Sequence, residues 1–214
     1  MLQIKITKGT KRVNLRFIDS QTLHVSVPSY YGQKDCDMLL RRYREWIDSN
    51  SEYLRAKEAK EAQELHDRDG EILYFGEWLS MSKLAKEHNV RNISDMYAEL
   101  EMLLRHFCAL WAERMQVSYT SIQLSKAQSF FGICTFDNHL RFSRMLVFAP
   151  KECIMYVVIH ELAHIRYKNH SKAFWAFVER FCAEYKQYRA LLRHNAWLYK
   201  ALLRRHSTCL DFAI

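Results

Sequence analysis

The sequence has very little of what usually divides a chain into independent parts. Only 2 of its 214 residues are proline, and it has no internal repeat, low-complexity tract or linker rich in glycine, proline and serine. Flexible tethers between domains normally have such a composition. With 49% hydrophobic residues the chain can bury a substantial core. We expect one integrated domain over residues 1–214, with a β-rich part that contains a long helix at 1–76 and a second part at 77–214.

Cysteine pairs and long apolar runs are also missing. The six cysteines are far apart and none forms a CxxC pair, so nothing indicates a zinc ribbon or a dense disulfide framework. The N-terminal residues lack an apolar core of signal-peptide length, and the apolar run at 153–159 is much shorter than the roughly 20 residues that span a bilayer. We expect a cytoplasmic protein without membrane segments, whose thiols are reduced: Cys36, Cys108, Cys134, Cys153, Cys182 and Cys209.

Positive charge is in excess but is not concentrated. Lys and Arg number 32 against 24 Asp and Glu, which gives a formal net charge of +8, yet no run of five like charges occurs. Scattered charges are typical of a solvated basic surface. A positive balance also attracts polyanions over long distances, so nucleic-acid binding stays open as an alternative role.

Hydrophobic periodicity indicates the fold class. Apolar and polar residues alternate in three short bursts within 2–27, separated by turn residues, which predicts three antiparallel strands joined by hairpins. Further along, the pattern predicts a strand at 72–75, a helix at 92–115, a hairpin within 130–142 and mainly helix after 150. The prediction is therefore an α+β fold with N-terminal antiparallel strands and a helical C-terminal half.

The most informative stretch, at 154–175, contains the sequence HELAH at 160–164. Residues i and i+4 of a helix project from the same face, so His160 and His164 can bind one metal ion together. Glu161 follows the first of them. From there its carboxylate can reach a metal-bound water without being a ligand itself, which is the position that a general base needs.

A third histidine, His170, can join this pair only if the helix ends first, because ten residues of continued helix would turn it away from His160. Asn169 favours the left-handed conformation that closes helices, and Ser171 favours the N-cap of a new helix. A corner between two helices would bring His170 back over the pair. Three histidines with an open fourth position are typical of a catalytic zinc site.

The competing interpretation is that these histidines only cap or pack. At the His and Glu content of this chain, HExxH is expected by chance about 3 times in 100, and with His170 added about 0.15 times in 100. The apolar residues at 156–159 also predict a buried helix, in which two histidines and a glutamate are costly unless a ligand satisfies them. The sequence therefore favours a metal site.

The same residues resemble those of a known family. HELAH at 160–164, Asn169-His170-Ser171 and Phe174-Trp175 are similar to the YgjP-like zinc metallopeptidases, relatives of the SprT-like and WLM zinc peptidases. The resemblance covers most of the chain. It implies a zincin-like fold that carries the HExxH helix, a peptide or protein substrate, Glu161 as the catalytic acid/base, and a zinc ion held by His160, His164 and His170.

One segment departs from that family. Its members usually have Arg-Trp-Gly-Ser-Cys upstream of the helix, whereas this chain has Phe130-Phe131-Gly132-Ile133-Cys134 and keeps only the glycine and the cysteine. We expect the substituted residues to pack in the core, so the family's substrate contacts in this segment do not carry over.

Two functions follow from the sequence. The leading one is a zinc-dependent metallopeptidase, in which Glu161 is the general base for a zinc-activated water. The alternative is a module that binds nucleic acid or protein around a structural metal, which a fourth ligand from Cys134 or Cys153 would favour because structural zinc sites are closed. Candidates for stabilising the oxyanion lie downstream, with no preference among them: Tyr185, Tyr188, Arg193 and His194.

Overall fold

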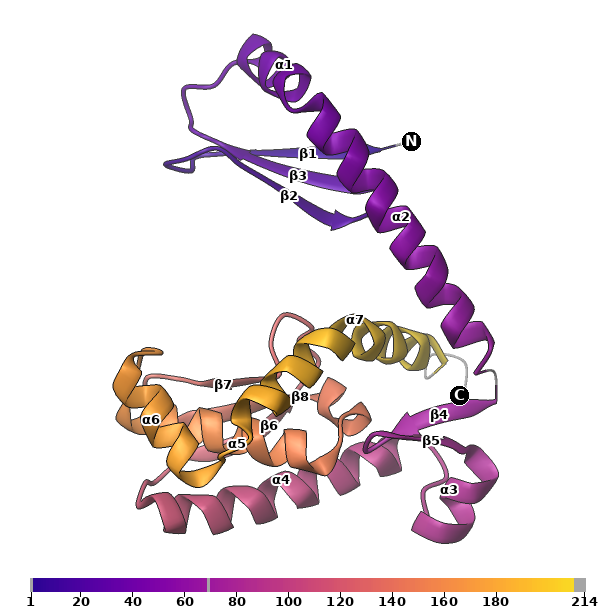
Figure 1. Cartoon of the computed structure of the whole chain (residues 1–214), viewed down its shortest axis with the longest axis vertical. Helices are drawn as coiled ribbons and strands as arrows, with labels where there is room; N and C mark the ends of the chain where they lie inside the picture. The colour runs from indigo at the N-terminus through magenta and orange to yellow at the C-terminus, as the bar shows by residue number, and fades with distance from the viewer. Residues whose placement is uncertain (1, 69, 210–214) are drawn as a thin grey trace. The chain divides into compact units, whose positions relative to one another are not determined.

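The computed structural model describes residues 2–68 and 70–209, and the chain divides into two compact units between Asp69 and Gly70 (Figure 1). The chain is α+β, with strands at its N-terminus and a helical C-terminal half, as the periodicity predicts. Within the described residues, no helix is both long enough and apolar enough to cross a membrane. The single integrated domain over 1–214 stays a prediction.

The first unit packs two helices on one face of a three-stranded sheet. Its elements are β1 (Gln3–Lys8), β2 (Asn14–Asp19), β3 (Thr22–Val27), α1 (Gln33–Arg42) and α2 (Arg44–His66). Leu23, Val25 and Val27 of β3 form its core together with Cys36 of α1 and Ile47 of α2. Successive side chains of a strand point to opposite faces, so the residues between these three lie on the other face of the sheet.

The pairing of these strands differs from the predicted antiparallel hairpins. β3 lies in the middle; β2 pairs with it antiparallel, but β1 pairs with it parallel, with Ile4 opposite Leu23 and Ile6 opposite Val25. The prediction of three antiparallel strands was wrong because an alternating pattern identifies strands and their faces, not their partners or directions. β3 takes the centre because its apolar side chains are fully buried, whereas β1 is exposed along its length.

The second unit begins with a hairpin of β4 (Glu71–Tyr74) and β5 (Glu77–Ser80). Its two turn residues, Phe75 and Gly76, both have positive φ, as a tight two-residue hairpin turn requires. A Cβ on Gly76 would lie 2.8 Å from Cγ of Pro150. The turn therefore needs glycine there both for its backbone conformation and for its close approach to the proline that precedes α5.

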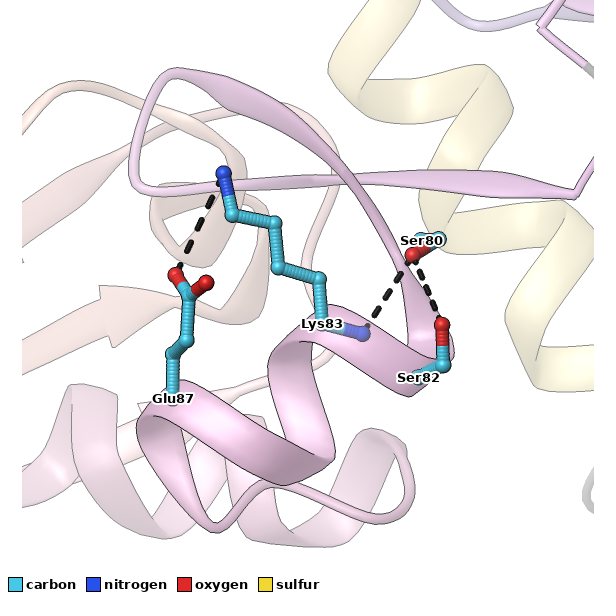
Figure 2. A network of polar contacts seen from close by, with 4 residues as sticks. All are labelled: Ser80, Ser82, Lys83 and Glu87. Atoms are coloured by element: carbon cyan, nitrogen blue, oxygen red, sulfur yellow. Dashed lines mark hydrogen bonds and ion pairs between the residues drawn. The ribbon is translucent and has the colours of Figure 1, made fainter.

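Helix α3 (Met81–His88) follows this hairpin directly. Ser80 caps it, because its hydroxyl accepts a hydrogen bond of 3.3 Å from the backbone N–H of Lys83 and lies 3.0 Å from the hydroxyl of Ser82. The Lys83 ammonium pairs with Glu87 one turn further on, at 3.9 Å (Figure 2). Glu87 is exposed, so this network belongs to the surface of the second unit.

The rest of the second unit surrounds one buried helix, α5. Its sheet has the order β6-β8-β7, in which β6 runs parallel to β8 and β7 antiparallel to it, so β7 is an edge strand. Figure 1 shows α5 between α4 and α7, and all three pack together through α5. The elements are α4 (Ile93–Met115), β6 (Ser121–Ser125), β7 (Gly132–Cys134), β8 (His139–Ser143), the 3₁₀ turn η1 (Arg144–Phe148), α5 (Lys151–Arg166), α6 (Lys172–Phe181) and α7 (Tyr185–Cys209).

The cysteines are single side chains spread through both units. Five of them are free: Cys36, Cys108, Cys134, Cys153 and Cys182. The side chain of Cys209 lies outside the described ones.

Candidate metal centre

Helix α5 begins after Pro150 and carries the HELAH residues in its last two turns. Its apolar run is buried against the neighbouring helices, and so are Glu161, Leu162 and Ala163. His160 and His164 are half-buried. The packing of the apolar residues thus fixes the helix, and the two histidines stand one turn apart at the edge of the core.

The corner after α5 forms in a different way from the one predicted. The helix ends with Tyr167 in an extended conformation (φ −128°, ψ 102°), and its N–H donates to the carbonyl of Ala163. Asn169 does not have the positive φ predicted from the sequence. That prediction was wrong because an extended residue can also end a helix and turn the chain. The predicted cap at Ser171 is present, since its hydroxyl accepts from the N–H of Phe174 at 3.3 Å.

This corner brings His170 back to the helix. One ring nitrogen from each of His160, His164 and His170 lies within 4.8 Å of the other two, and we call these residues the three-histidine cluster. Nε2 of His160 and Nε2 of His170 are 3.1 Å apart. Two nitrogens bound at about 2.0–2.1 Å to one tetrahedral zinc ion lie about 3.3 Å apart, so this spacing fits a shared metal ion.

Neighbouring groups orient the imidazoles of the cluster. Nδ1 of His164 lies 3.0 Å from the carbonyl oxygen of Tyr167, to which its N–H donates, and this leaves Nε2 as an acceptor for a metal. The hydroxyl of Tyr156 lies 3.5 Å from Nδ1 of His160. The ring of Phe174 stacks on that of His164, with centroids 4.5 Å apart. The ligand geometry is therefore held largely by packing and by one strong backbone contact.

Burial keeps these imidazoles neutral, as metal ligands must be. It lowers the pKa of His160 to about 3, with further lowering from His164, His170 and Arg189. Burial also lowers the pKa of His164, against the hydrogen bond to Tyr167, and that of His170. At neutral pH each ring therefore has a lone pair available.

Glu161 is enclosed beside the cluster, with only 5% of its surface exposed. Burial raises the pKa of its carboxyl to about 8, while a hydrogen bond from the backbone N–H of Cys134 acts in the opposite direction. The carboxyl is thus enclosed beside the cluster and holds its proton more tightly than an exposed carboxyl does.

Gly132 on β7 makes room for that carboxyl. A Cβ at this position would lie 2.7 Å from Cγ and 2.7 Å from Oε1 of Glu161. The glycine kept in the segment 130–134 is therefore a steric requirement of the glutamate.

Ile133 is 42% exposed, so the prediction that the substituted residues pack in the core was wrong for this side chain. Successive strand residues face opposite sides, and Ile133 points away from α5.

The cluster has no cysteine in it. Among the residues that the structure describes, the ligand atoms that come together are those of the three histidines alone. Cys153 is buried, and burial raises the pKa of its thiol to about 12. The fourth ligand from Cys134 or Cys153 that a structural site would use is thus not part of this cluster.

A family model described as YgjP-like, metallopeptidase domain, matches residues 82–195, which is more than half of the chain. The chain belongs to the YgjP-like family. The match includes the three-histidine cluster, Glu161 and Gly132. No curated protein and no solved structure matches this chain at a significant level. Membership implies a metallopeptidase and a metal ion, and the cluster of nitrogen ligands suits such an ion.

Beside the cluster lies a cavity of about 400 Å³, which we call the site cavity. Of the downstream candidates named from the sequence, Arg193 lines it, whereas Tyr185, Tyr188 and His194 do not. Sequence reasoning missed Arg189, although its spacing of four residues from Arg193 on one helix places both on the same face. The lining residues are Phe131, Gly132, Tyr156, Val157, His160, Glu161, His170, Trp175, Arg189, Leu192 and Arg193.

Replacing Gly132 by alanine should destabilise the second unit, because the new Cβ overlaps Glu161. We expect Gly132→Ala to lower the free energy of unfolding by about 1–3 kcal/mol, the usual cost of overpacking. Gly32→Ala is the control, because its Cβ would meet only Oδ2 of Asp35, at an ordinary contact distance of 3.5 Å. It should change the free energy of unfolding by less than about 1 kcal/mol. Urea denaturation of the metal-free protein, followed by tryptophan fluorescence, measures the free energy of unfolding of both variants.

A double-mutant cycle isolates the contact. In a Glu161→Ala background the further loss caused by Gly132→Ala should be clearly smaller, because Cγ and Oε1 of the glutamate are gone. An equal loss in both backgrounds would contradict a steric role of Gly132 toward Glu161.

Proposed function

We propose that this protein is a zinc-dependent metallopeptidase with a zincin-like fold. His160, His164 and His170 bind the zinc ion, and Glu161 is the catalytic acid/base. The observation that carries the proposal is the convergence of three neutral imidazoles beside an enclosed carboxyl at the wall of a cavity. Membership in the YgjP-like family supports it.

The donor set favours zinc over other common metals. Imidazole nitrogens suit zinc, whereas magnesium and calcium prefer oxygen ligands. Three protein ligands leave one position of a tetrahedral ion open, which is the arrangement of catalytic sites. A zinc ion bound there lowers the pKa of a water in the open position to about 7 and polarises a carbonyl of the substrate.

Glu161 moves the proton in this proposal. Its carboxylate takes a proton from the attacking water and later gives it to the leaving amine. The N–H of Cys134 holds the carboxylate in place and favours its charged form, and a nearby cation would favour that form further. Gly132 allows β7 to approach closely enough for this hydrogen bond.

Exchanging Glu161 for glutamine tests the proton transfer. Glu161→Gln keeps the shape of the side chain but removes the proton acceptor, so kcat/KM for casein or a mixed peptide library should fall by about 10²–10⁴. Zinc content, measured by plasma mass spectrometry, should stay at about one ion per chain because the glutamate is outside the ligand set. The matched control is Glu87→Gln, which changes only the exposed pair with Lys83 seen in Figure 2 and should leave both values unchanged.

Two results would contradict this function. One is a zinc-loaded wild-type protein that hydrolyses none of the peptides of a broad library. The other is a Glu161→Gln variant with the activity of the wild type.

A second candidate function, nucleic-acid binding, rests on the open face of the first unit's sheet. Lys5, His24 and Arg16 stand directly opposite one another across its three strands, on the face away from the core. Lys5 and Arg16 are exposed and His24 is half-buried. Two cations and a histidine in a row across a sheet form a surface on which a phosphate backbone can lie.

Binding to single-stranded DNA at several salt concentrations tests this candidate. The double variant Lys5→Gln, Arg16→Gln should weaken binding and reduce the dependence of log K on log[salt] by about 1 per removed charge. Arg44→Gln, an exposed arginine that pairs with Asp48 on α2, is the control and should change neither. Absence of binding by the wild type at low salt would exclude this role.

A further inference from the structure

Helix α7 contributes two arginines to the site cavity. Arg189 and Arg193 both line it, with the buried Leu192 between them. Residues four apart lie one above the other on a helix, so the two guanidinium groups approach the cavity from one side. His160, Glu161 and His170 line the same cavity. A group held by the arginines therefore lies beside the reacting centre.

Aromatic stacking holds Arg189 in place. Its guanidinium lies over the ring of Trp175, 4.7 Å from the centroid. Trp175 itself stacks on Tyr185, at 5.2 Å and 16°, and on His170, at 5.5 Å and 21°. A cation over a fixed aromatic ring loses little further freedom when it binds a ligand. The side chain of Arg189 is thus preorganised for binding a ligand.

The described part of the chain offers neither arginine an ion pair. Among the described residues, no carboxylate lies within ion-pair distance of the guanidinium of Arg189 or of Arg193. Arg189 is half-buried, so solvent screens its charge incompletely. Such a group has a strong preference for an anionic ligand.

Arg189 also stands close to the three-histidine cluster. Its guanidinium lies over Trp175, and the ring of Trp175 stacks on that of His170. The guanidinium repels a metal ion that the same histidines hold, because both are positively charged. A negatively charged group between the arginine and the cluster would offset this repulsion.

We propose that Arg189 and Arg193 bind a carboxylate of the peptide substrate and make the enzyme selective for peptides that carry one next to the scissile bond. The proposal rests on the peptidase function proposed above. A carboxylate is planar and accepts two parallel hydrogen bonds from a guanidinium, which a neutral peptide group does not. The carboxylate is either the free C-terminus or the side chain of an acidic residue.

Binding measurements separate this inference from catalysis. Zinc-loaded Glu161→Gln protein is titrated calorimetrically with two matched pairs of peptides: trialanine with a free C-terminus against its C-terminal amide, and an end-blocked pentapeptide with glutamate against the same peptide with glutamine. At least one anionic member should bind roughly 10- to 100-fold more tightly than its neutral partner. The pair that shows the preference identifies the source of the carboxylate.

Variants of the two arginines then test whether these side chains cause the preference for the anionic peptide. Arg189→Gln and Arg193→Gln should each weaken binding of the anionic peptide and leave the neutral one unchanged, whereas Arg189→Lys should keep part of the preference. The control is Arg180→Gln, an exposed arginine that lies over Phe181 and is outside the cavity lining. It should have no effect. Circular dichroism confirms that each variant is folded.

The possible negative results distinguish an error in the carboxylate inference from an error in the proposed peptidase function. Equal binding of anionic and neutral peptides by the parent protein would overturn the inference, and so would Arg189→Gln weakening both peptides equally. Cleavage by the wild type without any charge preference would also overturn it and leave the peptidase function standing. Preferential binding of the anionic peptide without cleavage by the wild type would support the inference and contradict the peptidase function.

Discussion

The structure of the second unit depends on holding the carboxyl of Glu161 inside the fold, next to three imidazoles. An enclosed carboxyl is costly, and here the backbone N–H of Cys134 provides its hydrogen bond. That bond requires the edge strand β7 to lie directly against α5, which only glycine at position 132 allows. β7 is in turn placed by β8, which forms the middle of the sheet. The sheet thus places this backbone N–H beside the carboxyl.

The cluster follows from the same arrangement. Packing of α5 between α4 and α7 fixes His160 and His164, and the extended Tyr167 both turns the chain and supplies the carbonyl that orients His164. Tyr167 therefore both ends the helix and sets the tautomer of His164. Phe174 and Trp175, from the next helix, cover the rings of His164 and His170. Phe174 and Trp175 thus provide packing contacts for the three-histidine cluster.

The sequence predicts what depends on local chemistry. HELAH on a helix, the cap at Ser171 and the hairpin that contains β7 and β8 all follow from spacing and turn residues. The sequence does not predict features that depend on contacts between residues far apart in the chain. The parallel pairing of β1 with β3 has no sequence signal of its own, and Gly132 is meaningful only once Glu161 lies beside it. Arg189 is likewise one of many arginines until α7 packs on α5. Spacing along a helix or strand shows which residues lie on the same face of it, but not which other element packs against that face.

The central claim is that three histidine nitrogens, and no sulfur, hold the metal ion with one position open. X-ray absorption at the zinc edge of the zinc-loaded protein measures this directly. The account predicts three nitrogen ligands and one oxygen ligand, all at about 2.0–2.2 Å. A sulfur ligand at about 2.3 Å would show that a cysteine closes the site and would contradict the account.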